Sequence, residues 1–181
     1  MNYLLVDCDG CLLDFDRAFN QYAKRIGIKE KPLGIHTRIA YNLTKKEQYD
    51  WLREFTKEPE FSEMRTISGS YQALSWFKDQ GYFNIVITNW DYPNRYHNLK
   101  AQFGNTIDAV HLNGFGNSKK EFLSRFKPTI FIEDDPKKAV EGLECGHTCF
   151  LLKTDINHGD CPSGIKLVNN WFEIIDIVSN T

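Results

Sequence analysis

The feature that most constrains the fold is a short apolar run near the N-terminus that ends in two carboxylates. Tyr3-Leu4-Leu5-Val6 is followed directly by Asp7-Cys8-Asp9-Gly10. A short apolar run bounded by a turn signal is typical of a buried strand, and side chains two residues apart on a strand point the same way. Asp7 and Asp9 should therefore face one site, where two like charges need a compensating partner such as a divalent cation. Gly10 lets the chain turn away where a side chain would obstruct the site.

The pattern Asp-x-Asp-Gly also occurs at polar strand ends without function and at the start of EF-hand calcium loops. A calcium loop beginning at Asp7 would need glycine at its sixth position and glutamate at its twelfth. The chain has Leu12 and Ala18 there, which excludes the calcium loop.

Apolar runs and helical patterns alternate along the rest of the chain. Strands are expected at residues 84–89, 108–112, 129–132 and 148–152, and helices at 14–26, 68–80, 93–103, 119–126, 136–143 and 171–178. This alternation predicts an α/β fold, a Rossmann-like, doubly wound parallel sheet covered by helices on both faces. Such sheets bind ligands at the carboxyl ends of their strands, near the point where the strand order reverses.

Residues 16–66 differ from this pattern because they are rich in charged and aromatic side chains and poor in β-branched runs. Thr44 and Glu47 form a capping-box pattern that opens a short helix. We expect one domain over residues 1–181, with residues 16–66 forming a small helical cap inserted after the first strand. The insert has more basic than acidic side chains, which suits an anionic substrate.

Charge and hydropathy argue against two classes of partner, nucleic-acid polymers and membranes. The net charge of −2 gives no argument for a nucleic-acid polymer as partner, and no apolar run is long enough to cross a bilayer. The N-terminus lacks the pattern of a signal peptide, and five cysteines, an odd number, suggest free thiols. We therefore expect a cytoplasmic protein without a membrane partner. The sequence does not indicate an oligomeric state.

Polar residues at four places follow the expected strands or open a helix. They are Asp7-Cys8-Asp9-Gly10, Thr88-Asn89, Lys119 or Lys120, and Asp134-Asp135. In order and spacing these residues resemble the four motifs of the haloacid dehalogenase-like hydrolase superfamily. The resemblance covers residues 3 to about 152, and it departs from the usual pattern at Cys11, where threonine or valine is more common.

The resemblance implies phosphoryl transfer with an assigned role for each carboxylate. Asp7 would be the nucleophile that forms an aspartyl phosphate, and Asp9 the acid that protonates the leaving oxygen and then deprotonates water. Mg2+ would be bound by the carboxylates of Asp7 and Asp134 and by the backbone carbonyl of Asp9. The expected function is a Mg2+-dependent phosphatase acting on a small phosphomonoester.

The phosphate-binding residues implied by the resemblance are Gly10, Thr88, Asn89 and Lys119. We prefer Lys119 to Lys120 because it opens the helix, and the choice between the two stays open. Asp135 either supports the residues of the site from behind or is the N-cap of the next helix. We interpret Glu133 as a solvated acid at a strand end.

Two other functions remain open from the sequence. A phosphotransferase such as a sugar-phosphate mutase uses the same four motifs, and a catalytically silent fold could bind a phosphate or a partner protein.

Within the superfamily, Asp7 to Phe15 and residues 61–70 resemble the 5'(3')-deoxyribonucleotidase branch. Those enzymes place aromatic residues of a small cap over a nucleotide base. The aromatic candidates here are Phe15, Tyr41, Tyr49, Trp51 and Phe55. Trp90, Asp91 and Arg95 follow Thr88 in a loop near the site, where they are candidates for substrate contact, although we interpret Trp90 as a packing residue.

Overall fold

The computed structural model describes residues 2–33, 37–90, 92–155, 157 and 159–180. These residues form one sheet of six parallel strands. The strands are β1 (Asn2–Asp7), β2 (Tyr82–Thr88), β3 (Ala109–Leu112), β4 (Ile130–Glu133), β5 (Thr148–Leu152) and β6 (Lys166–Val168). Their order across the sheet is β3-β2-β1-β4-β5-β6. Because β1 pairs with both β2 and β4, the strand order reverses beside β1, and its carboxyl end is the expected place for a ligand.

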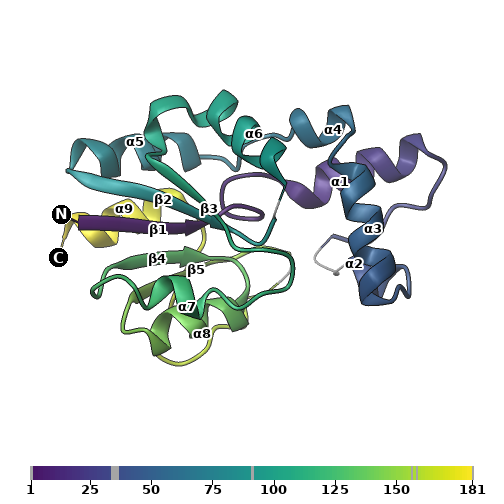
Figure 1. The fold of residues 1–181 in the computed structure, drawn as a ribbon. Coiled ribbons are helices and arrows are strands. Elements are labelled where there is room, and N and C mark those ends of the chain that lie inside the picture. The colour runs from purple at the N-terminus through teal and green to yellow at the C-terminus, as the bar shows by residue number, and fades with distance from the viewer. Residues whose placement is uncertain (1, 34–36, 91, 156, 158, 181) are drawn as a thin grey trace.

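Helices cover both faces of the sheet, which confirms the predicted doubly wound α/β architecture (Figure 1). The helices that follow the insert are α5 (Ser70–Asp79), α6 (Pro93–Phe103), the 3-10 turn η1 (Gly104–Thr106), α7 (Lys120–Leu123), α8 (Pro136–Glu144) and α9 (Trp171–Ser179). Two apolar layers result: Leu4 and Val6 pack with α5, α6 and α9, whereas Leu5 packs with α7 and α8. This alternation follows from the two-residue period of a strand buried on both faces.

The segment after β1 forms a group of helices beyond the carboxyl ends of the strands, on the right in Figure 1. They are α1 (Phe15–Arg25), α2 (Thr37–Ala40), α3 (Lys45–Phe55) and α4 (Pro59–Ser62). We call residues 16–66, which contain nearly all of these helices, the helical insert. The chain enters and leaves it side by side, because the Asp14 N–H donates to the Arg65 carbonyl at 2.9 Å and the Ile67 N–H donates to the Leu12 carbonyl at 2.8 Å.

The local sequence patterns predict some of these elements correctly and others not. The capping box of Thr44 and Glu47 is present at the start of α3. The helix expected at 119–126 is shorter than predicted, and β6 was not predicted. It is a three-residue edge strand, and Lys166-Leu167-Val168 is too short to stand out as an apolar run. No helix in the described part of the chain is long and apolar enough to cross a membrane.

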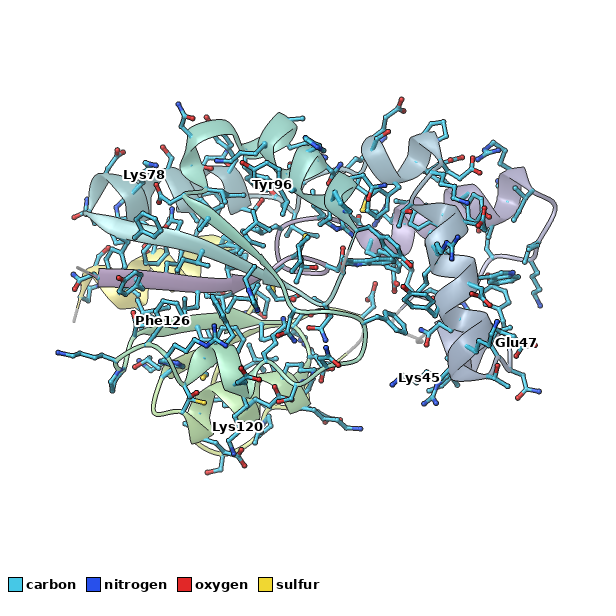
Figure 2. The ribbon with its side chains drawn as sticks, viewed as in Figure 1. Lys45, Glu47, Lys78, Tyr96, Lys120 and Phe126 are labelled. Carbon is cyan, nitrogen blue, oxygen red and sulfur yellow. The ribbon has the colours of Figure 1, made fainter. Side chains whose placement is uncertain are left out.

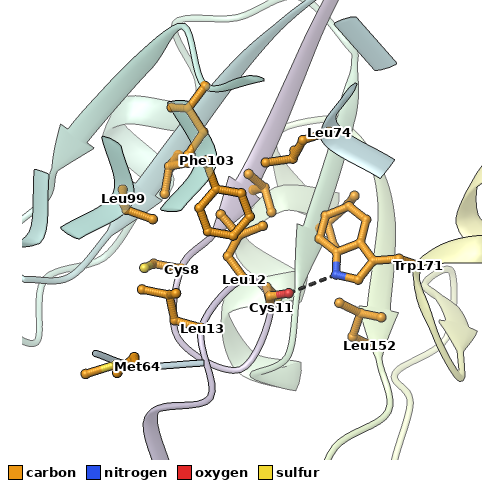
Figure 3. Close-up of a cluster of buried hydrophobic side chains, with 14 of the residues drawn as sticks. Cys8, Cys11, Leu12, Leu13, Met64, Leu74, Leu99, Phe103, Leu152 and Trp171 are labelled. Carbon is orange, nitrogen blue, oxygen red and sulfur yellow. Dashed lines mark hydrogen bonds between the residues drawn. The ribbon is translucent and has the colours of Figure 1, made fainter. Parts of the chain in front are cut away.

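The loop after β1 is anchored in the core rather than exposed (Figure 3). Cys8, Cys11 and Leu12 are all fully buried. The Trp171 indole of α9 donates a hydrogen bond to the Cys11 carbonyl at 2.8 Å. This loop therefore has a fixed shape even though it carries the charged residues of the first motif. All five cysteines are free thiols, as expected.

Candidate active site

Asp7 ends β1, and the chain turns sharply at Gly10. Gly10 has a φ of +80°, and a β-carbon built on it would lie 2.1 Å from Oδ2 of Asp134. Its N–H donates to the Leu13 carbonyl at 2.9 Å. Only glycine suits this position, because a side chain would be strained by the backbone and would collide with a carboxylate.

Lys119 approaches Asp7 from the start of α7. Its buried ammonium donates to Oδ1 of Asp7 and to Oε1 of Glu133, the latter at 2.6 Å. Burial alone would lower the pKa of Lys119, but the carboxylates of Asp7 and Glu133 raise it above its usual range, so the side chain is a cation. Lys120 lies on the outer side of the molecule, where its ammonium binds Glu144 at 2.9 Å (Figure 2). The structure thus brings Lys119, and not Lys120, to the site.

The interpretation of Glu133 as a solvated acid is wrong. Its side chain is 1% exposed, and its Oε2 accepts hydrogen bonds from the backbone N–H groups of Asp134 at 3.0 Å and Asp135 at 3.1 Å. Burial, with the nearby Asp7 carboxylate, raises the pKa of Glu133 to about 7, although Lys119 opposes the shift. Glu133 is therefore a site residue, which the sequence signalled only as the first of three consecutive acids.

Asp135 borders the same cleft but serves as the N-cap of α8. Its side chain accepts a hydrogen bond from the Lys137 N–H at 2.8 Å, and Pro136 occupies the first helical position. Both features are typical of a helix start. Of the two roles left open from the sequence, the helix cap is the one that its hydrogen bond supports.

Asp7, Cys11 and Asp134 offer ligand atoms that lie within 4.8 Å of one another. The Asp134 residue is 5% exposed, and no described residue donates a hydrogen bond to its carboxylate. Burial raises the pKa of Asp134 well above its usual range, and the carboxylates of Glu133 and Asp7 add to the effect. A buried carboxylate in this position fits a divalent cation, which would restore its charged form. The Cys11 thiol lies beside these carboxylates, but burial raises its pKa well above the usual range, and a protonated thiol does not suit a cation that prefers oxygen ligands.

Asp9 borders the cleft, and both of its carboxylate oxygens accept hydrogen bonds. Oδ1 accepts from Nη2 of Arg95 at 2.8 Å, and Oδ2 accepts from Nε1 of Trp90. Burial raises the pKa of Asp9, and the Arg95 guanidinium opposes that shift. Trp90 and Arg95 therefore bind the candidate acid, so the interpretation of Trp90 as a packing residue is incomplete. Asp91 lies outside the described residues.

The two expected phosphate-binding residues at the end of β2 differ in position. The Thr88 side chain is buried, its Oγ1 accepts from the Trp90 N–H at 3.3 Å, and it does not line the cleft. Asn89 does line the cleft, and its Nδ2 donates to the Asn117 carbonyl at 2.8 Å. Asn89 is thus better placed than Thr88 to meet a ligand.

These groups border a cleft of about 850 Å3 between the strand ends and the helical insert. Of the five aromatic residues proposed from the sequence, Phe15 lines the cleft and the other four do not. Phe55 packs on Phe19 at a centroid distance of 5.3 Å, and Tyr41 packs on Trp51 at 5.1 Å. Tyr49 contacts Phe115 at 5.4 Å. The aromatic wall of the cleft therefore comes from Phe15, Trp90 and Phe115.

Solved structures match the chain over nearly its full length. A predicted phosphatase from Clostridium acetobutylicum matches with a TM-score of 0.73 at 19% identity, with 99% of each chain covered. A haloacid dehalogenase-like family hydrolase from Streptococcus pneumoniae matches with a TM-score of 0.70 at 14% identity, with 98% of each chain covered. The chain has the haloacid dehalogenase-like fold. A third structure with this fold, the D,D-heptose 1,7-bisphosphate phosphatase from B. bronchiseptica complexed with magnesium and phosphate, matches with a TM-score of 0.62 at 12% identity, with 99% of each chain covered.

The haloacid dehalogenase-like fold confirms the resemblance inferred from the four motifs at the level of the fold. No protein-family model and no curated protein sequence matches the chain. Other solved structures with this fold are described as dehalogenases. Because one fold hosts different reactions, the function must be argued from the site.

Proposed function

We propose that the chain is a Mg2+-dependent phosphatase that hydrolyses a small phosphomonoester through an aspartyl phosphate on Asp7. The observation that carries the proposal is the Asp7 carboxylate at the end of β1, bound by Lys119 and bordering an open cleft. A carboxylate held in this way is a suitable nucleophile, and the adjacent ammonium stabilises negative charge on phosphoryl oxygens.

Asp7 and Asp134 are the residues that would hold Mg2+, with the backbone carbonyl of Asp9 as a further ligand implied by the first motif. Such a cation neutralises phosphoryl oxygens and orients the substrate. Magnesium usually keeps several waters and needs few protein carboxylates, which agrees with a site that offers two. Lys119 supplies the second positive charge, and Asn89 is the neighbouring polar group at the cleft wall.

The chain's own residues account for both half-reactions. An oxygen of Asp7 bonds to phosphorus while the bond from phosphorus to the leaving oxygen breaks, and Asp9 gives that oxygen its proton. Asp9 then takes a proton from water, whose oxygen attacks phosphorus, and the bond between phosphorus and Asp7 breaks to release inorganic phosphate. Burial raises the pKa of Asp9, which is the direction that the acid role requires.

The helical insert would act as the cap of this site. Phe15, the first residue of α1, and the insert residues Arg17 and Leu52, with Asp16 and Gln48, form one wall of the cleft opposite the strand ends. Helices in that position exclude water from the phosphoryl group and contact whatever is attached to it. The cap would therefore determine which phosphomonoester is accepted, and a nucleoside monophosphate is the candidate that the aromatic wall favours.

The Asp9 carboxyl also helps to distinguish a phosphatase from a dehalogenase. A halide leaves carbon without needing a proton, whereas an alcohol leaving phosphorus does need one, so a carboxyl group beside the nucleophile favours phosphoryl transfer over dehalogenation. A phosphotransferase would use the same groups, and release of inorganic phosphate to water separates it from a phosphatase. A silent phosphate-binding fold would release none.

The test is a screen of phosphorylated metabolites and aryl phosphates with Mg2+ and with EDTA. We expect release of inorganic phosphate with Mg2+, its loss with EDTA, and its abolition in Asp7→Asn, because an amide cannot attack phosphorus. Asp9→Asn should lose at least about 100-fold in rate on unactivated esters. Asp176→Asn, which changes an exposed carboxylate on α9, is the matched control and should leave the rate unchanged. Near-normal turnover by folded Asp7→Asn protein would sink the covalent mechanism.

A further inference from the structure

Arg95 is a buried arginine that the proposed chemistry does not use. It lies in α6, its side chain is 0% exposed, and it does not line the cleft, so it is not placed to touch a substrate. Its Nη2 donates to Oδ1 of Asp9 at 2.8 Å, whereas its Nε has no hydrogen-bond partner among the described residues. Burying a guanidinium with an unsatisfied donor costs free energy, and an ion pair at such a position is poor at stabilising a fold.

The guanidinium is held from the other side by the helical insert. Its central carbon lies 4.4 Å from the ring centroid of Phe61 in α4, and Nη1 lies 3.6 Å from the Met64 sulfur. The Trp90 ring, whose indole N–H binds the second oxygen of Asp9, lies 5.4 Å from the same carbon. A cation stacked on aromatic faces keeps a fixed position at moderate cost. Arg95 thus connects the insert to one specific carboxylate.

We propose that Arg95 is a positioning residue that holds the Asp9 carboxyl at the rim of the cleft in the orientation needed for proton transfer to the leaving oxygen. The inference rests on the proposed phosphatase function. It identifies the Arg95 guanidinium as the group through which the helical insert holds the Asp9 carboxyl in place. With Oδ1 held by Arg95 and Oδ2 by Trp90, the Asp9 side chain has one orientation, and a quarter of it stays exposed toward solvent. Proton transfer depends on such alignment because donor and acceptor must meet within hydrogen-bonding distance.

The leaving group provides a readout that a purely structural role would not change. The value of kcat/KM covers the steps up to release of the leaving group. Phenol leaves poorly and needs the proton from Asp9, whereas 2,4-dinitrophenolate leaves without it. We expect Arg95→Met to lower kcat/KM by at least about tenfold for phenyl phosphate and by much less for 2,4-dinitrophenyl phosphate. Arg95→Lys, which keeps a charge, should recover part of the loss.

The matched control is Arg25→Met. Arg25 is another arginine that packs against α4, with ion pairs to Glu58 and Glu60, but it does not contact Asp9. Its removal should leave the ratio of the two kcat/KM values unchanged. Trp90→Phe removes the other hydrogen bond to Asp9 and should shift the ratio in the same direction as Arg95→Met. If the arginine variants fail to fold, an unchanged ratio in Trp90→Phe would show that the Asp9 carboxyl does not need to be held, and would overturn the inference.

A double mutant tests whether Arg95 acts through Asp9. In the Asp9→Asn background, Arg95→Met should cause no further loss of kcat/KM for 4-nitrophenyl phosphate, because the group that it positions is gone. A further loss in that background, or an equal loss for all three aryl phosphates, would overturn the inference. Failure of the proposed function itself looks different: the wild-type chain would then show no turnover of any aryl phosphate above Asp7→Asn, and the role of Arg95 would fall with it.

Discussion

Lys119 and Asp7 lie 112 residues apart in the sequence and form a buried ion pair at the carboxyl end of β1. The same ammonium binds Glu133, while the Asp134 carboxylate beside them has no ion-pair partner among the described residues. With the ion pair of Asp9 and Arg95 added, the site contains four carboxyl groups and only two cationic side chains. A phosphate ester brings further negative charge, so the site as a whole calls for an additional cation before it can bind its substrate.

Lys119→Met should separate the two candidate lysines. We expect it to lower kcat by about 100- to 1,000-fold, the usual scale for removing one group that stabilises the transition state. It should also destabilise the fold by roughly 3 kcal/mol, because it leaves two carboxylates buried without their partner. Lys120→Met, which removes only an exposed ion pair with Glu144, should change neither quantity appreciably. Steady-state kinetics and urea unfolding on the three proteins measure both effects, and an active Lys119→Met enzyme would contradict the assignment.

Asp134→Asn should weaken Mg2+ binding while Asp135→Asn should not. Asp134 presents a buried carboxylate to the candidate metal site, whereas Asp135 caps α8. We expect the loss of one of two carboxylate ligands to weaken Mg2+ affinity at least about tenfold. Isothermal titration with MgCl2 reports this directly, without reference to activity. Equal Mg2+ affinity in the two variants would place the metal elsewhere.

Gly10→Ala and Gly27→Ala form a matched pair for the role of the first glycine. Both residues have a positive φ, +80° and +76°, so the backbone strain introduced by alanine should destabilise the fold by about 1 kcal/mol in each variant, before any collision at Gly10 is counted. A β-carbon at Gly27 meets nothing within 4 Å, whereas one at Gly10 would lie 2.1 Å from Oδ2 of Asp134. Only Gly10→Ala should therefore displace Asp134 and weaken Mg2+ binding. Titration and thermal unfolding of both variants test the difference, and equal Mg2+ affinity would refute it.

His147 should make the fold sensitive to acid. Its Nδ1 accepts a hydrogen bond from the Thr129 N–H at 3.2 Å, so its Nε2 carries the proton toward the Leu123 carbonyl at 3.1 Å and the ring is neutral. Burial lowers the pKa of His147, with the Leu123 carbonyl opposing the shift. Below about pH 6.5 the unfolded chain therefore binds more protons at this residue than the folded chain, and stability falls as the pH falls.

The measurement is the free energy of unfolding from pH 5 to 8 for the wild type and His147→Gln. The variant should be less stable above pH 7, because it loses the hydrogen bond to Thr129, but it should lose less stability on acidification. His97→Gln, a change at an exposed histidine of α6, should keep the wild-type profile. Parallel profiles for wild type and His147→Gln would contradict the prediction.

The parallel sheet could be predicted from the sequence because its four central strands, β2, β1, β4 and β5, are largely buried. Leu4-Leu5-Val6 and residues 149–152 are continuous apolar runs followed by polar residues, and β5 has the predicted bounds. The edge strand β6 and the short helices α2 and α4 lack such a signal, because three or four residues do not complete a period. Their positions depend on packing against the rest of the molecule.

The site residues could be named from the sequence where they directly follow a strand or match one of the four motifs. Asp7, Asp9 and Asp134 lie at strand ends, and Lys119 is preferred because it opens a helix. Glu133 and Arg95 were missed or left as neighbours, because their importance lies in contacts across 14 and 86 residues, with Lys119 and Asp9 respectively. A sequence does not distinguish a buried ion pair from an exposed one. Only the fold shows which carboxylate is removed from solvent.

The last prediction concerns the aromatic wall of the cleft and the substrate. If the leaving group is a nucleoside, Phe15 at the start of α1 is placed to stack on its base, since it lines the cleft while Tyr41, Tyr49, Trp51 and Phe55 do not. We expect Phe15→Leu to raise KM for deoxynucleoside monophosphates about tenfold, the scale of one lost stacking contact, and to leave KM for hexose phosphates unchanged. Tyr41→Leu, which alters an aromatic contact with Trp51 outside the cleft, should raise neither. Hydrolysis of both substrate classes by the three proteins decides the question. If the wild type hydrolyses hexose phosphates with a kcat/KM equal to or higher than that for deoxynucleoside monophosphates, the chain is still a phosphatase, but a nucleotide is not its substrate.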